Sequence, residues 1–100
     1  YLEAHQQLGI LRQKQGNLVD AEYHFRRCLE VDPGDCWSLL YLANNLAVQG
    51  HHEAVEEQYR AAINFHPDDP TAYEFFADWL DERSRSAEAA SIRQRLRGLA

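Results

Sequence analysis

The feature that most constrains this chain is a repeat with a period of 34 residues. The segment RRCLEVDPGD at 26–35 resembles the segment RAAINFHPDD at 60–69 in its order of basic, apolar and acidic residues. Pro33 and Pro67 therefore stand 34 residues apart. Periods of about 20–50 residues are typical of stacked structural repeats, in which one unit cannot bury its apolar face alone. We therefore expect a row of similar units that share one continuous core.

Within a unit, the spacing of apolar residues predicts two helices joined by a glycine turn. The first helix of the second unit has an apolar face with the i, i+3, i+4, i+7 spacing, made by Leu39, Leu42, Ala43 and Leu46. Gly50 then ends the pattern, as a helix-terminating glycine does. A second apolar stripe follows and consists of Val55, Tyr59, Ala62 and Ile63. Each unit is thus predicted to be a helical hairpin.

The acidic, proline-bearing segments predict where one unit stops and the next begins. Pro33 and Pro67 cannot continue a helix interior. Asp35, and Asp69 together with Thr71, carry side chains that can cap the following helix.

Small residues recur on the first helix of each unit: Gly9, Ala43 and Ala77 are 34 residues apart. A small residue lets the second helix of a hairpin come close to the first, and a large one would strain the core by about 1–3 kcal/mol. We therefore predict an all-α fold, an α–α superhelix (solenoid) of three helix-turn-helix hairpins, with repeats at about 2–35, 36–69 and 70–100 of a single domain, 1–100. Because the chain lacks Met and begins at Tyr1, we expect it to be a fragment of a longer protein.

These residues resemble the tetratricopeptide repeat, whose pattern is W-x2-L-G-x2-Y, then A-x3-F, then P over about 34 residues. The first unit matches it at Leu8, Gly9, Ala21, Phe25 and Pro33, and the second at Leu42, Ala43, Tyr59 and Pro67. The units depart from it at Arg12, at Val55 and, in the last helix, at Arg93. The resemblance implies a protein–protein interaction module that binds a peptide or a partner segment in a concave groove.

By that resemblance, the first helices of the units line the groove. The implied groove residues are Glu3, Gln6, Ile10, Gln13, Trp37, Leu40, Tyr41, Asn44, Val48, Thr71, Glu74, Phe75, Asp78 and Asp81. Asn44 stands where family members often hold an asparagine that bonds the ligand backbone, and an amide can both donate and accept. Trp37, Tyr41 and Phe75 are candidate aromatic anchors, although packing between repeats would explain them equally well.

Charge indicates the kind of partner. The net charge is −6, which disfavours nucleic acid and membrane surfaces as partners. The groove positions that clamp a C-terminal carboxylate in some family members hold no cation here. An acidic stripe on the third unit, made of Glu74, Asp78, Asp81 and Glu82, predicts instead a partner with Lys or Arg.

Catalysis and metal binding are not indicated by any motif. There is no nucleophile–base arrangement and no phosphate-binding glycine loop, so we expect neither an enzyme nor a cofactor. Adjacent His51 and His52 converge poorly on one ion, and His5, His24 and His66 fall at unrelated phases, so no metal site is predicted.

Two cysteines, Cys28 and Cys36, favour free thiols in a reducing compartment such as the cytoplasm. The alternative to groove binding is a structural or oligomerising role through the end faces of the array. Arg93 and Arg97 replace apolar residues of the earlier units, and we expect them to make the last helix a polar cap. The chain is therefore expected to be a monomer or a weak homo-oligomer.

Overall fold

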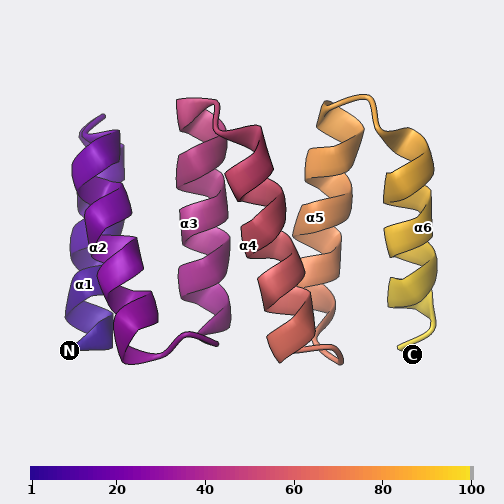
Figure 1. Ribbon diagram of the computed structural model, residues 1–100, viewed down its shortest axis with the longest axis horizontal. Helices are drawn as coiled ribbons and strands as arrows, with labels where there is room; N and C mark the ends of the chain where they lie inside the picture. Colours follow the sequence, from indigo (N-terminus) through magenta and orange to yellow (C-terminus); the bar gives the residue numbers. More distant parts are fainter. Residues whose placement is uncertain (100) are drawn as a thin grey trace.

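The computed structural model describes residues 1–99, which form six α-helices and no strand. The helices pair into three hairpins: α1 (Leu2–Lys14) with α2 (Leu18–Val31), α3 (Cys36–Gln49) with α4 (His52–Phe65), and α5 (Pro70–Glu82) with α6 (Ser86–Arg97). The hairpins stand side by side in chain order, with the two ends of the chain at opposite ends of the row (Figure 1). The predicted all-α solenoid is confirmed. No helix within residues 1–99 has both the length and the apolar character needed to cross a bilayer.

The predicted caps start the helices that follow each proline-bearing loop. The Asp35 carboxylate accepts a hydrogen bond from the Ser38 backbone N–H at 3.0 Å, and the Asp69 carboxylate accepts one from Thr71 N–H at 3.0 Å. Each bond satisfies a backbone donor that the first helical turn leaves without a partner. The caps therefore fix where α3 and α5 begin.

The turn inside each hairpin has one residue in the left-handed region, and these residues are 34 positions apart. Gly16 has φ of 80° and Gly50 has φ of 86°, and Ser84 takes the same place with φ of 62°. A residue with a Cβ is strained in this region, whereas glycine is not. The third hairpin therefore keeps the turn geometry of the other two at a conformational cost.

Close approach of the two helices in a hairpin depends on the small residues of the first helix. Gly9 lies against the Phe25 ring, and a Cβ at Gly9 would stand 2.6 Å from the nearest ring carbon. Ala43 and Ala77 are fully buried at the equivalent positions of α3 and α5. The core extends from these contacts through all three hairpins.

The helices form two rows with different spacing. In the inner row, α1 contacts α3 and α3 contacts α5. In the outer row, within residues 1–99, α2 does not contact α4 and α4 does not contact α6. A row whose members touch is shorter than a row whose members do not, so the array is concave on the side of α1, α3 and α5.

A buried polar network holds the first and second hairpins together. Asn45 is fully buried and donates to the Leu18 carbonyl at 3.0 Å and to the Gln13 side-chain oxygen at 3.2 Å. Gln49 donates to the Asn45 oxygen at 2.7 Å and to Glu22 at 2.9 Å. Because every member has a partner, burial of these amides does not leave an unpaired polar group.

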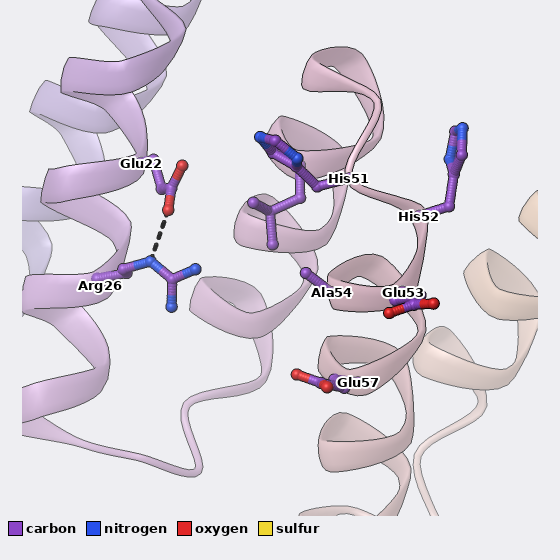
Figure 2. A pocket seen from close by; sticks show the side chains of 8 residues that line it. Glu22, Arg26, His51, His52, Glu53, Ala54 and Glu57 are labelled. Atoms are coloured by element: carbon purple, nitrogen blue, oxygen red, sulfur yellow. Dashed lines mark hydrogen bonds and ion pairs between the residues drawn. The ribbon is translucent and has the colours of Figure 1, made fainter.

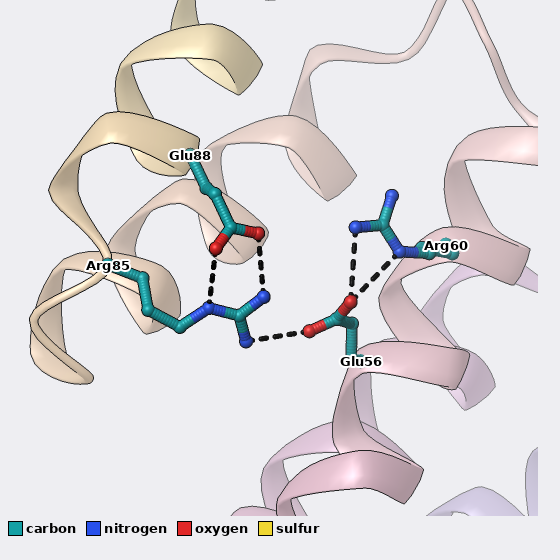
Figure 3. Close-up of polar contacts among 4 residues, drawn as sticks. All are labelled: Glu56, Arg60, Arg85 and Glu88. Carbon is teal, nitrogen blue, oxygen red and sulfur yellow. Dashed lines mark hydrogen bonds and ion pairs between the residues drawn. The ribbon is translucent and has the colours of Figure 1, made fainter.

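Charged side chains join the second and third hairpins (Figure 3). Arg85, in the turn before α6, donates to Glu56 of α4 at 2.7 Å and to Glu88 at 2.6 Å. Glu56 also accepts from Arg60 at 3.1 Å, and the Arg60 guanidinium lies 5.2 Å from the centre of the Phe76 ring on α5. Glu56 therefore connects two arginines, one of which reaches α5 and the other α6.

Candidate functional site

The predicted groove residues all lie on α1, α3 and α5, the helices of the concave row. Gln6, Ile10, Gln13, Tyr41 and Thr71 are partly buried, and the exposed ones are Glu3, Trp37, Asn44, Val48, Glu74, Phe75, Asp78 and Asp81. Leu40 is the exception: its side chain is only 5% exposed and belongs to the core, so its placement in the groove was wrong. The reason is that α3 packs against neighbours on both sides, which leaves it a narrow exposed face.

A cavity of about 230 Å³ opens between α1 and α3 on the concave side. It is lined by Ile10, Gln13, Lys14, Phe25, Tyr41 and Asn44. The Phe25 and Tyr41 rings stack with their centres 5.6 Å apart and supply much of the apolar wall. An apolar wall with amides and a lysine at its edge suits a bulky apolar side chain carried on a polar backbone.

A line of aromatic rings continues from this cavity to the third hairpin. Trp37 lies 5.9 Å from Tyr41 and 6.5 Å from Phe75, measured between ring centres. Trp37 is 51% exposed and Phe75 is 45% exposed. These rings therefore pack between repeats and also present apolar surface to solvent.

The amides of the groove divide into two groups. Gln6 donates to Asp35 at 2.8 Å and to the Ser38 hydroxyl at 3.0 Å, and Gln13 accepts from Asn45. These two amides support neighbouring helices. Asn44 is exposed and makes no side-chain hydrogen bond within residues 1–99, which leaves its donor and acceptor able to bind a partner.

Arg93 of α6 forms ion pairs with two of the four carboxylates in the acidic stripe. It pairs with Asp78 at 3.1 Å and with Asp81 at 2.5 Å. These contacts with the carboxylates raise the pKa of the guanidinium above its usual value, with Asp81 as the larger cause. The sequence suggested four uncompensated carboxylates, but of these four only Glu74 and Glu82 make no ion pair within residues 1–99.

A larger cavity, about 510 Å³, lies on the outer side between α2 and α4 (Figure 2). Its lining is mainly charged or ionisable and consists of Glu22, Arg26, Leu46, His51, His52, Glu53, Ala54 and Glu57. It contains no aromatic anchor other than the two histidines. Among residues 1–99, no cluster of three or more His, Cys, Asp or Glu side chains is arranged to hold a metal ion. We therefore favour the concave side as the functional site.

The cysteines take structural positions. Cys28 is buried, and its thiol lies 3.4 Å from the Leu2 carbonyl, to which it donates. Burial raises the pKa of the Cys28 thiol, and burial together with Asp69 and Asp35 raises that of Cys36. A raised pKa keeps a thiol protonated, the form that is a poor nucleophile.

The comparisons with known proteins agree with this geometry. The model of the tetratricopeptide repeat family matches residues 2–35, which span α1, α2 and the loop before α3. Residues 2–35 match a tetratricopeptide repeat. For the first unit the resemblance drawn from the sequence is therefore confirmed, and the second and third hairpins repeat its pair of antiparallel helices. No curated protein matches the sequence.

Solved structures share the fold of this chain at low sequence identity. The type III secretion translocator chaperone SycD of Yersinia enterocolitica has a TM-score of 0.86 and 21% identity, over 98% of this chain and 73% of that one. A second structure of SycD, an alternative dimer, has a TM-score of 0.83 and 21% identity, over 98% of this chain and 74% of that one. MamA has a TM-score of 0.85 and 17% identity, over 98% of this chain and 57% of that one. The chain thus spans a little over half of the MamA chain.

Proposed function

We propose that this tetratricopeptide-repeat chain is a protein-interaction module that binds a partner segment along its concave face, without chemistry of its own. The observation that carries the proposal is the pair of half-exposed rings, Trp37 and Phe75, which contact each other beside the cavity between α1 and α3. Aromatic anchors of this kind dominate the energy of many interfaces. The fold shared with a translocator chaperone supports the same class of function.

The preferred segment has a bulky apolar residue for the cavity and a basic residue beyond it. The cavity has a Phe25–Tyr41 wall, and Glu74 lies on the third hairpin without an ion pair among residues 1–99. Asp78 and Asp81 can also receive a basic group, but it must compete with Arg93. Selectivity for basic segments therefore depends mainly on Glu74 and Glu82, the two carboxylates of the acidic stripe that make no ion pair within residues 1–99.

Selection of peptides from a random displayed library tests the proposal, followed by affinity measurement with fluorescence polarisation. Trp37→Ala should raise the Kd of a selected peptide by about 30-fold or more, the scale of an interface hot spot. Tyr23→Ala is the matched control, because Tyr23 is 55% exposed but lies on α2 of the outer row. Circular dichroism must show that both variants keep their helices. Peptides whose affinity Trp37→Ala leaves unchanged would contradict groove binding.

A second candidate function, stacking through the end faces, is favoured by one observation on α1. Leu8 is 37% exposed and Leu11 is 47% exposed, whereas Leu42 and Phe76, the counterparts of Leu8, are fully buried by the preceding hairpin. This face of α1 is therefore available to another helix. Sedimentation of the wild type and of a Leu8→Glu, Leu11→Glu variant separates the two functions. A concentration-dependent dimer that the variant abolishes would favour stacking, and a monomer would favour the groove alone.

A further inference from the structure

The first hairpin brings two histidines from facing helices together. The Nδ1 atoms of His5 on α1 and His24 on α2 are 3.3 Å apart. Their ring centres are 5.5 Å apart, and the ring planes are tilted by 32°. Both side chains are partly buried, so the pair is neither a core contact nor freely solvated.

The approach of α1 to α2 at Gly9 explains why the histidines meet. His24 precedes Phe25, whose ring fills the space that a side chain at position 9 would take. His5 lies one turn before Gly9 and therefore shares its helix face. The close helix packing thus places two imidazoles opposite each other.

The other hairpins hold different side chains at these two places. The 34-residue shift gives Leu39 with Gln58 in the second hairpin, and Tyr73 with Ile92 in the third. Leu39, Tyr73 and Ile92 are buried members of the apolar core. Packing alone therefore does not require imidazoles at this position, and what distinguishes the first hairpin is the polar contact between the two Nδ1 atoms, which lie within hydrogen-bond distance.

We propose that His5 and His24 form a two-nitrogen site for Zn²⁺ that links α1 to α2. Zinc–nitrogen bonds of about 2.0–2.1 Å at a tetrahedral angle hold two ligand atoms about 3.3 Å apart. The Nδ1 atoms of this pair already have that separation. Water fills the other coordination positions, because no third ligating side chain joins the pair within residues 1–99. The site is therefore weaker than a structural zinc site with four protein ligands.

The charged side chains near the pair offset each other. Arg27 pairs with Glu30 at 2.8 Å, so the carboxylate limits repulsion between the guanidinium and an incoming cation. Zinc binds the neutral form of imidazole, so the test is made near neutral pH.

Thermal unfolding of the purified chain with added ZnCl₂ near neutral pH tests the site. Zinc that binds only the folded chain raises the melting temperature, and above the Kd each tenfold increase in zinc should add about 5–10 °C. MgCl₂ at the same concentrations should leave the melting temperature unchanged, because magnesium prefers oxygen ligands.

Two variants make the test specific. His5→Leu with His24→Gln installs the residues of the second hairpin, so it keeps a packing that this fold accepts, and it should lose the response to zinc. His51→Gln with His52→Gln removes the other histidine pair and should respond like the wild type. An equal zinc response in the His5→Leu, His24→Gln variant would overturn the proposal. So would a folded wild type that does not respond to millimolar zinc.

Discussion

Replacement of Gly9 by alanine should destabilise the chain because the new methyl group has no space. Its carbon would stand 2.6, 2.8 and 2.9 Å from three atoms of the Phe25 ring. Carbon atoms in contact prefer about 3.5–4.0 Å, so the ring or the helix must move by about 1 Å. Phe25 is buried and stacks on Tyr41, which leaves the ring little room to move. Overpacking of this kind costs about 1–3 kcal/mol.

A second effect of Gly9→Ala opposes this cost. Alanine is favoured over glycine in a helix interior by about 1 kcal/mol. The expected net loss is therefore about 1 kcal/mol, which lowers the melting temperature of a chain of this size by about 4–8 °C. Chemical and thermal unfolding followed by circular dichroism measure it.

The same substitution in a Phe25→Leu background separates the two effects. Without the ring, the clash is relieved and the helix preference remains, so Gly9→Ala should become stabilising by up to about 1 kcal/mol. Gly50→Ala is the control, because no atom lies within 4 Å of its added methyl group and its cost comes from φ of 86°. That cost should be the same in both backgrounds. If Gly9→Ala lowers stability equally with and without the Phe25 ring, the contact is not the cause.

Two further predictions concern the third hairpin. Ser84→Gly should raise stability by about 1 kcal/mol in thermal melts, because φ of 62° is strained for serine and not for glycine; no gain would mean that Ser84 is not strained. The hydrogen bond from Arg85, followed by that from Arg60, lowers the pKa of Glu56. The ionised Glu56 side chain therefore contributes to the free energy of unfolding above the usual glutamate pKa, and this contribution is lost as pH falls through the lowered value. The wild type should therefore exceed Glu56→Gln in stability near pH 6 by up to about 1 kcal/mol, and melts at about pH 3 should show this difference reduced; a difference independent of pH would refute the ion pair as its source.

The helices and their caps could be predicted from the sequence because they depend on local chemistry. Asp35 caps the helix that follows it, and Gly50 ends one, through contacts within a few residues. The small residue at position 9 also predicted the close helix approach, since its size limits the distance directly. Period, capping and residue size are all readable without knowledge of the neighbouring hairpin.

The details of the groove depended on contacts that cross between helices. Asn44 and Asn45 are adjacent and chemically identical, yet Asn45 is buried in a polar network and Asn44 is exposed. The two asparagines differ in burial because successive residues of a helix point about 100° apart. Only the packing of the neighbouring hairpin decides which of the two directions is covered.

Contacts between residues far apart in the sequence also could not be predicted. Arg93 reaches Asp78 and Asp81 across the hairpin, and His5 reaches His24 because Gly9 brings the helices close. Part of the signal for the histidine pair was present, because His5 occupies a position where the other two units hold buried apolar or aromatic residues. The repeat alignment alone does not show which pairs of positions touch.

The unequal spacing of the two helix rows makes the groove easier to widen than to narrow. Helices of the inner row already touch, so a narrower groove would compress side chains in contact, and repulsion rises steeply with such compression. A wider groove separates the inner-row helices, which loses attraction that weakens only gradually with distance, and it narrows the gap on the outer side, where α2 and α4 do not meet. The groove should therefore widen readily around a large bound side chain and should not narrow around a small one. Affinity should grow with the volume of the anchoring side chain until the cavity is full, and thin segments should bind weakly even when their charges match.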